Sequence, residues 1–249
     1  MTCRPEDAPE NAVPPGGDQV IPFSRRRAAI ARRLTQSVQT IPHFYLSLDA
    51  DVTAALTWRR AFNHARAARI TVTDLAAKVT ALALRRFPRL NAHVGAEAIT
   101  LKSGVHLGIA VAVEDGVLVP VIPEADRLSL VALSERSRRN AAAAREGRLS
   151  AGPAGTFTLT SLGMYGVRQF LPIINPPECA ILALGAAQPR VMPAPEGVAV
   201  RQMMTLTLAS DHRAADGAEA AQFLGAVKAA LESIPDSLAG WVEAEEATG

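Results

Sequence analysis

Segments with helical periodicity and segments with strand character follow one another along this chain without a regular alternation. Stretches in which apolar residues recur every three or four positions predict helices, and short runs of β-branched and aromatic residues predict strands. A doubly wound parallel sheet would require a repeating strand–helix–strand order, which the sequence does not have. The order predicts one α/β domain, in which helices pack against a mixed β-sheet.

Turn and capping residues set the boundaries of the expected elements. Ser24 and Thr73 are expected to cap two helices, and Gly147 to end a third. We expect helices at residues 24–39, 52–67, 73–87, 129–145 and 217–231. We expect strands at residues 44–48, 156–160, 179–184 and 204–209, and a pair within 105–122 around a turn at 114–116. Because proline and glycine are frequent near the start, residues 1–20 are expected to be a disordered linker or arm, and residues 21–249 the folded domain.

Composition argues against several classes of function. The hydrophobic content of 49% is enough for one large core, or at most two small ones. The net charge of +2 gives no global field that would draw the chain to nucleic acid or an anionic membrane, and no apolar run reaches the ~18 residues of a membrane span. The arginine-rich stretch 25–33 has no aromatic residues for stacking, so we expect a solvated or subunit-contact face there. Cys3 and Cys179 cannot build a disulfide framework, which favours a reducing, intracellular compartment.

The segment at residues 211–217 carries the strongest chemical signal. It lies between an expected strand and an expected helix, where loop side chains can point into a cleft. A histidine such as His212 can exchange a proton near neutral pH, and the carboxylate of Asp216 can fix local geometry by pairing with an arginine. For a single histidine, the competing interpretation is a capped helix start with a buried, hydrogen-bonded ring. We assign no metal site to the sequence.

Several longer motifs occur in order along the chain. They are residues 24–34, 40–45, 155–166 and 174–177, followed by the His-x-x-x-Asp-Gly pattern at 212–217. In this order they resemble the motifs of the dihydrolipoamide acyltransferases, the E2 core subunits of 2-oxoacid dehydrogenase complexes. The resemblance covers residues 21–231, and several motifs in the correct order are far more specific than any single pattern.

The resemblance implies a fold like that of chloramphenicol acetyltransferase, a trimer, and acyl transfer between two thiols. A thiol is mostly protonated at neutral pH, so a base must take its proton as the sulfur attacks the thioester carbonyl. His212 matches the family's general base. Thr160 matches the hydroxyl that donates to the oxyanion, and Asp216 matches the residue that orients the site through an arginine. Without the resemblance, Thr160 would be interpreted as an ordinary strand residue, and Arg213 is expected to serve the structure.

The family also binds coenzyme A, as acetyl-coenzyme A or free, in a channel opposite the entrance for dihydrolipoamide. Arg59 matches a phosphate-contacting arginine, whose planar set of donors suits phosphate. Thr73 stands where the family has a serine, and Ser161 where many members have asparagine. Gly185 matches a glycine that lets the backbone approach the ligand. The competing interpretations are a surface charge for Arg59, a helix cap for Thr73, and turn residues for the other two.

The expected partners depend on what the chain carries. Family members usually begin with a lipoyl domain, but none of the three lysines, Lys78, Lys102 and Lys228, lies in a context that resembles a lipoylation site. We therefore expect that this chain does not carry the lipoyl group. Either it is the core fragment of a longer protein, or it takes the acyl group from a lipoyl domain on another chain, with the E1 and E3 subunits of such a complex as further partners. The C-terminal sequence differs from the family's leucine-rich anchor, so we expect a homotrimer rather than a cage.

Three functions stay open on the sequence alone. An acyltransferase that moves acetyl between dihydrolipoamide and coenzyme A is favoured, because residues 161–166 resemble the pyruvate-type subunits. One alternative is a noncatalytic core or scaffold subunit, which the missing lipoyl domain favours. The other is a chloramphenicol-type acetyltransferase acting on a small hydroxyl compound. The expected compartment is the cytoplasm of a bacterium or, in a eukaryote, the mitochondrial matrix.

Overall fold

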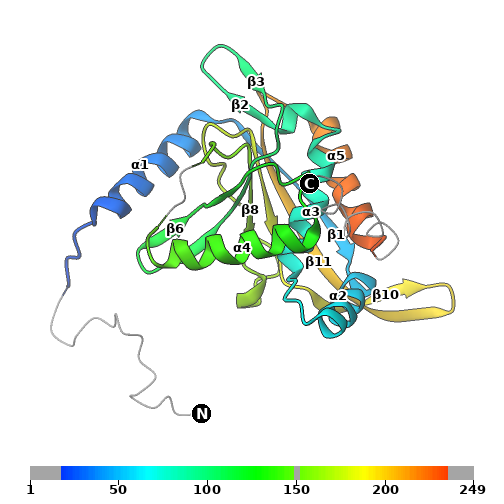
Figure 1. The fold of residues 1–249 in the computed structure, drawn as a ribbon. Helices are drawn as coiled ribbons and strands as arrows, with labels where there is room; N and C mark the ends of the chain where they lie inside the picture. Colours follow the sequence, from blue (N-terminus) through cyan, green and yellow to red (C-terminus); the bar gives the residue numbers. More distant parts are fainter. Residues whose placement is uncertain (1–17, 149–151, 235–249) are drawn as a thin grey trace, which may run out of the picture.

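The computed structural model describes residues 18–148 and 152–234, and its centre is a seven-stranded sheet (Figure 1). The strands of this sheet are β1 (His43–Asp51), β4 (Leu107–Ile109), β7 (Val121–Ile122), β8 (Phe157–Ser161), β9 (Ala180–Leu184), β10 (Gln188–Ala194) and β11 (Gly197–Asp211). They run in the order β1-β11-β9-β8-β4-β7, with β10 paired to the first half of β11. Because β8 is parallel to β4 and β9 while the remaining pairs are antiparallel, the expected mixed sheet is confirmed.

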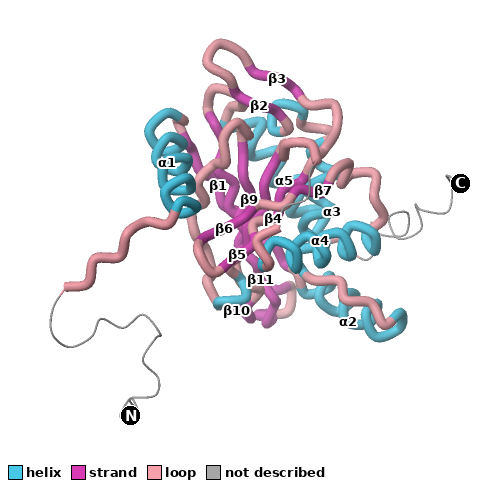
Figure 2. Tube along the Cα trace, turned by 60° about the vertical axis from the view of Figure 1, so that its left-hand side comes forward, coloured by secondary structure: helices cyan, strands magenta, loops and turns pink. Residues whose placement is uncertain are grey.

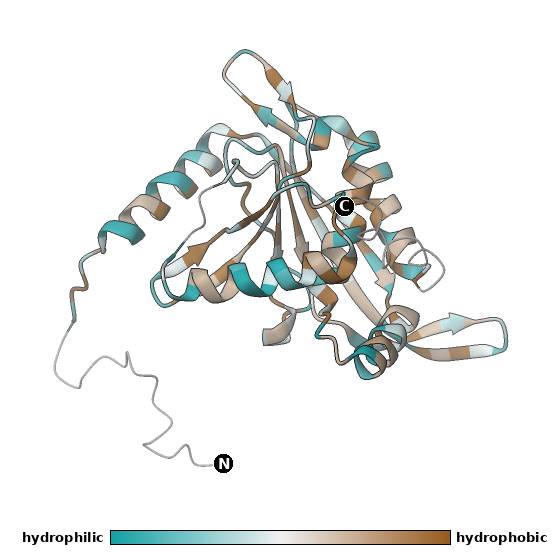
Figure 3. Cartoon of the chain, viewed as in Figure 1, coloured by the Kyte–Doolittle hydropathy of each residue, from teal (hydrophilic) through white to brown (hydrophobic). Residues whose placement is uncertain are grey.

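Helices cover one face of this sheet. The α-helices of the described residues are α1 (Arg25–Thr40), α2 (Thr53–Arg66), α3 (Val72–Leu84), α4 (Leu130–Arg145) and α5 (Gly217–Glu232). α3 packs against α4 and α5, and α5 packs against β1, whereas α1 lies across the sheet from them (Figure 2). Hydrophobic residues concentrate on the central strands (Figure 3), and the core joins Leu75 of α3, Leu208 of β11 and Phe223 of α5.

Capping residues define the helix ends, and one expected cap is wrong. The Ser24 hydroxyl accepts a backbone N–H in the first turn of α1 at 3.0 Å, and Gly147, with a φ of +76°, follows α4, both as expected. The N-cap of α3, however, is Thr71 and not Thr73. The Thr71 hydroxyl accepts the backbone N–H of Asp74, whose carboxylate accepts the backbone N–H of Thr71. Asp74 stands three residues after Thr71, so Thr73 cannot close this reciprocal pair and lies inside the helix.

The region expected to form one pair of strands is split into four. β4 and β7 belong to the main sheet, while β5 (Val111–Val113) and β6 (Gly116–Leu118) form a separate hairpin around the expected turn. Pro120, between β6 and β7, has no N–H to give to a strand ladder, which explains the second break. The hairpin of β2 (Ala92–Val94) and β3 (Ile99–Leu101) was not expected, because strands of three residues are too short to show an alternation.

The opposite face of the sheet is covered in part by the chain between β8 and β9. A small buried cluster on that side consists of Ile41, Ile174, Ile181 and Ala209. Beside it, Tyr45 of β1 pairs with Ala209 and is 38% exposed. In the short helix η3 (Gly163–Tyr165), which follows β8, Met164 and Tyr165 are 75% and 66% exposed. Exposed apolar side chains that lie together are typical of a surface that contacts another protein.

Candidate active site

His212 lies in the loop between β11 and α5, which connects Asp211 to Gly217. Its side chain is 56% exposed, and its backbone N–H donates to the carbonyl oxygen of Pro42 at 3.1 Å. The imidazole is therefore accessible to a substrate while its backbone is anchored to the residue before β1. This exposure excludes the competing interpretation of a histidine buried in the core.

Asp211 and Arg213 hold the backbone on both sides of His212. Asp211 is fully buried, and its carboxylate accepts the backbone N–H of Arg213 at 2.9 Å and the guanidinium at 2.7 to 3.2 Å. The hydrogen bond to Asp211 raises the pKa of Arg213 further above its ordinary value. The backbone N–H of Asp211 donates in turn to the carbonyl oxygen of Cys179 at 2.8 Å. Arg213 thus has the structural role expected of it, and its partner is a buried carboxylate that the sequence analysis did not assign.

Asp216 is the exposed carboxylate of the same loop. Its side chain is 84% exposed, and its Oδ1 lies 3.9 Å from Nδ1 of His212. It occupies the N-cap position of α5 without a side-chain capping bond. Among the residues described for this single chain, Asp216 has no arginine partner, so the expected orienting pair is not formed there. The arginine-bound carboxylate is Asp211, which could have been noticed from its place at a strand end, two residues before Arg213.

The ring of Phe44 packs against the candidate base. Its centroid lies 4.8 Å from that of the His212 imidazole, with the two planes tilted by 54°. Phe44 is on β1 opposite Ser210 of β11, so strand pairing brings it to the histidine. A tilted aromatic contact of this kind restricts the orientation of the imidazole. Phe44 was noted in the sequence only as part of the motif at 40–45.

Thr160 is not brought together with His212 within one chain. Thr160 of β8 lies opposite Ala183 of β9, which lies opposite Thr207 of β11. From Thr207 the chain continues for five more positions to His212, which is roughly 17 Å at the ~3.4 Å rise of a strand residue. Thr160 therefore lies in the row that crosses the middle of β1, whereas His212 follows the end of β11.

Arg59 and Thr73, by contrast, lie near the same helix start. Nη1 of Arg59 is 3.5 Å from the carbonyl oxygen of Ile70, directly before the N-cap of α3, and Thr73 is in the first turn of that helix. Nε of Arg59 is buried and has no hydrogen-bond partner among the described residues. A guanidinium beside a helix N-terminus is a favourable arrangement for an anion, which would have to bind the terminal nitrogens because Nε is buried.

Position 185 requires glycine because another part of the protein's own backbone lies against it. A Cβ atom at Gly185 would lie 1.9 Å from the carbonyl oxygen of Arg168, a distance that no carbon can adopt. The close approach is therefore made by the segment that follows η3. Ser161, at the end of β8, accepts the backbone N–H of Gly163 at 3.4 Å, which fits the competing interpretation of a turn residue.

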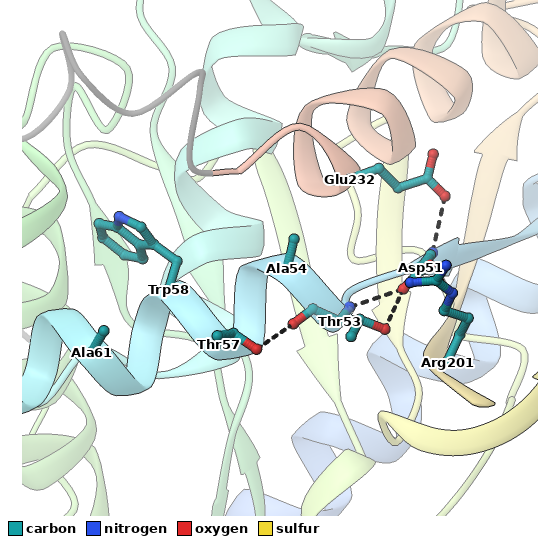
Figure 4. Close-up of a pocket in the computed structure, with 8 residues that line it drawn as sticks. All are labelled: Asp51, Thr53, Ala54, Thr57, Trp58, Ala61, Arg201 and Glu232. Carbon is teal, nitrogen blue, oxygen red and sulfur yellow. Dashed lines mark hydrogen bonds and ion pairs between the residues drawn. The ribbon is translucent and has the colours of Figure 1, made fainter. Parts of the chain in front are cut away.

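Figure 4 shows a pocket of about 700 Å³. It opens at Asp51, the end of β1 that is remote from the His43–Asp211 pairing. Its charged groups already have partners, since Glu232 accepts the backbone N–H of Asp51 at 2.9 Å and Nε of Arg201 is 3.8 Å from the Asp51 carboxylate. The pocket is therefore not part of the site around His212. The lining residues are Asp51, Thr53, Ala54, Thr57, Trp58, Ala61, Arg201 and Glu232.

Residues 18–148 and 152–234 contain neither a membrane-spanning helix nor a cluster of metal ligands. None of their helices is both long and apolar enough to cross a membrane. No group of three or more histidine, cysteine or acidic side chains among them is placed to hold a metal ion.

Comparison with solved structures defines the class of protein. The cubic core of the pyruvate dehydrogenase multienzyme complex superimposes with a TM-score of 0.85 and 32% sequence identity, over 91% of this chain and 99% of that chain. A chloramphenicol acetyltransferase superimposes with a TM-score of 0.52 over 86% of this chain and 99% of that chain. At 13% identity this second likeness shows the fold alone, and it confirms the expected fold class.

Comparison of sequences defines the family. The model of the 2-oxoacid dehydrogenases acyltransferase (catalytic domain) family matches residues 15–239. The dihydrolipoyllysine-residue acetyltransferase component of the pyruvate dehydrogenase complex of Rickettsia felis is 36% identical over 221 residues, 86% of this chain and 54% of that protein. Component 2 of the mitochondrial complex of Arabidopsis thaliana is 39% identical over 246 residues, 95% of this chain and 46% of that protein. The chain belongs to the 2-oxoacid dehydrogenase acyltransferase family, and it spans about half the length of these relatives.

Proposed function

We propose that the protein transfers an acetyl group between dihydrolipoamide and coenzyme A, with His212 as the general base. The observation that carries the proposal is a half-exposed imidazole whose backbone is fixed by Pro42, Cys179 and the Asp211–Arg213 pair. His212 takes the thiol proton as the sulfur attacks the thioester carbonyl, which forms the new carbon–sulfur bond and an oxyanion. When the tetrahedral intermediate collapses, the old carbon–sulfur bond breaks and the proton returns to the departing sulfur.

The oxyanion needs a hydrogen-bond donor near His212. Thr160 of the same chain does not lie there. The strand register keeps Thr160 away from His212 within one chain, so a second copy must supply the hydroxyl if Thr160 is the donor. The exposed apolar residues around η3 support such a contact between copies. We propose a homotrimer in which His212 of one copy faces Thr160 of the next.

The proposed coenzyme A site begins at Arg59 and Thr73. Both lie near the start of α3, and the terminal nitrogens of the Arg59 guanidinium suit one of the phosphate groups. We propose Ser161 and Gly185 as further residues near the pantetheine arm, since they follow the proposed oxyanion donor and the strand beside it. Gly185 would act there by keeping the Arg168 backbone close to the sheet.

The proposed setting is a 2-oxoacid dehydrogenase complex of the pyruvate type. The relatives named above are components of pyruvate dehydrogenase complexes. We propose that a lipoyl domain on another chain presents the acetyl group, and that the E1 and E3 subunits are further partners. The proposed compartment is the bacterial cytoplasm or the mitochondrial matrix.

An assay with acetyl-coenzyme A and free dihydrolipoamide tests the reaction. Wild type is expected to form the new thioester, and His212→Ala to lose about 10²–10⁴-fold in rate, the usual contribution of a general base. His64→Ala, an exposed histidine on α2, serves as the matched control and should leave the rate unchanged. An inactive wild type would favour a scaffold subunit, and transfer to chloramphenicol alone would favour the hydroxyl acetyltransferase. Equal rates for wild type and His212→Ala would exclude His212 as the base.

A further inference from the structure

Glu178 is a buried acidic residue that the proposed mechanism does not use. It lies in the loop before β9, is 3% exposed, and accepts hydrogen bonds from the Thr158 hydroxyl at 2.6 Å and the Asn175 amide at 3.3 Å. Its Oε1 lies 2.6 Å from the position that a Cβ on Gly155 would take, so the chain leaves room for the carboxyl group. Burying a carboxyl group costs free energy unless its contacts compensate. A buried carboxyl group at this position is therefore a candidate for a functional role.

The loop at residues 174–178 is fixed from several sides. The Ser37 hydroxyl of α1 donates to the Ile174 carbonyl oxygen at 2.6 Å, and the Ile174 N–H donates to Nε2 of His43 at 3.1 Å. The backbone N–H of Val94 in β2 donates to the carbonyl oxygen of Pro177 at 2.8 Å. On the side of the sheet, Glu178 fixes the loop by accepting the hydrogen bond from the Thr158 hydroxyl of β8.

The same loop supports the segment that carries His212. The backbone N–H of Asp211 donates to Cys179, the residue directly after Glu178, and the N–H of His212 donates to Pro42, the residue directly before His43. The two carbonyl groups that hold the His212 segment therefore belong to Cys179 and Pro42. Each is directly next to a residue whose side chain fixes the loop, Glu178 or His43. A shift of the loop would move both anchors of the imidazole.

We propose that Glu178 is a positioning residue for acyl transfer: its neutral carboxyl group fixes the loop that anchors His212, and loss of its proton loosens that loop. The inference rests on the proposed function of His212. When Glu178 is protonated, its carboxyl group stays in the packed loop in contact with Thr158 and Asn175 and carries no buried charge. When it is ionised, a buried negative charge is left with the Thr158 and Asn175 donors alone, which favours opening toward water.

The surroundings of Glu178 set the pH at which this happens. Burial raises the pKa of Glu178 from its ordinary 4.5 to about 7, against the opposing effects of the hydrogen bonds from Thr158 and Asn175 and of the Arg33 charge. An unfolded chain would lose this proton near 4.5, whereas the folded chain keeps it to about 7. The stability that the neutral form provides is therefore complete at low pH and is lost as the pH rises from 4.5 to 7.

The other titratable groups near Glu178 come from three elements. Arg33 of α1 donates to the carbonyl oxygen of Pro176 and is the cation that acts on the carboxyl group. His93 of β2 forms a backbone bridge with Glu178, and its Nε2 is 2.7 Å from the carbonyl oxygen of Gly155. Burial raises the pKa of the neighbouring Cys179 thiol to about 12, so this thiol stays neutral when Glu178 titrates.

The pH dependence of kcat in the acetyl-transfer assay tests the proposal. Wild type is expected to lose kcat as the pH rises through about 7, while Glu178→Gln, which keeps the shape but cannot ionise, should not show this decline. Glu196→Gln, at an exposed turn between β10 and β11, is the matched control and should keep the wild-type profile. Glu178→Ala should lower kcat by about 10- to 100-fold with little change in KM, since it displaces the base without touching the substrates.

Two results would overturn the proposal. One is a Glu178→Gln profile that keeps the wild-type decline, and the other is a folded Glu178→Ala variant with wild-type kcat. If Glu178→Ala does not fold, the Glu178→Gln profile decides. Thermal unfolding followed between pH 5 and 8 needs no activity, and the wild-type Tm should fall more steeply than that of Glu178→Gln over this range. An inactive wild type with this difference in Tm would count against the proposed function alone, whereas identical Tm profiles would count against Glu178.

Discussion

The region around His212, at one end of the central sheet, is built differently from the region around Thr160. In the first region, the Asp211–Arg213 pair, two backbone hydrogen bonds and the Phe44 ring fix one loop from within the chain. In the second region, Thr160 shares its register row with Thr207 and Ser47, whose hydroxyl oxygens lie 2.9 Å apart, and Gln169 donates to Ser47. Among the described residues, neither region contacts the other within one chain, so a site that uses both His212 and Thr160 requires a neighbouring copy.

The largest expected effect comes from substituting His212 and Thr160 on different copies of the chain. His212→Ala and Thr160→Ala should each be nearly inactive, because the first lacks the proposed base and the second lacks the proposed oxyanion donor, which would be worth about 10²–10³-fold in rate. Mixing the two after joint refolding should restore activity at about one site in four, where an intact His212 meets an intact Thr160 across a symmetric interface. Acetyl transfer measured before and after refolding checks this. Mixed trimers no more active than the separate variants would place the whole site inside one chain.

The next largest effect concerns the buried support of the His212 end. Asp211→Ala removes an acceptor of hydrogen bonds from Arg213 and should lower the free energy of unfolding by about 1.5–3 kcal/mol, the range for hydrogen bonds to charged groups. The loss stays moderate because the Arg213 side chain is 41% exposed and can turn toward water. Urea unfolding followed by circular dichroism measures it. An unchanged midpoint would show that the pair does not support the loop.

A comparable effect on stability is expected in the Thr160 region from Gly185→Ala. The new methyl group would meet the Arg168 carbonyl oxygen, and overpacking of this kind costs about 1–3 kcal/mol in stability. Gly225→Ala in α5 is the control, since no atom lies within 4 Å of the new carbon and a helical alanine should stabilise the protein by about 1 kcal/mol. Thermal unfolding of both variants compares them. If the Gly185→Ala protein is as stable as wild type, the contact with Arg168 does not explain the glycine, and its expected role of letting the backbone approach a ligand is favoured.

The smallest effect is expected from Asp216→Ala. Its exposed carboxylate makes no capping bond, so its contribution should be limited to its charge at the start of α5, about 0.3–1 kcal/mol. The same urea titration used for Asp211→Ala gives the comparison. A loss in stability as large as that of Asp211→Ala would mean that Asp216 has a strong partner in the assembled protein.

The main elements of the fold were predictable because their local patterns agree with their final environment. The strand at 179–184 is apolar throughout and lies in the middle of the sheet, and the apolar positions of α5 face the core. β10 was missed because it pairs only with the exposed first half of β11 and has no buried face to create a pattern. The cap of α3 was misplaced because two threonines precede Asp74, and only the reciprocal bonds identify Thr71.

The site was predictable only where a short motif carries it. His212 follows from a local pattern, and the comparisons confirm the family to which that pattern belongs. The support of His212 by Asp211, Phe44 and the loop around Glu178 depends on contacts between residues far apart in sequence, such as the Asp211–Cys179 bond. No local spacing encodes these contacts, since they arise only when β1, β9 and β11 pair.

The strand register keeps Thr160 and His212 of one copy apart. If neighbouring copies complete each site, turnover per milligram will not be a constant. It will decline on dilution below the dissociation constant of the assembly, with a lag on reconcentration, although every monomer stays folded.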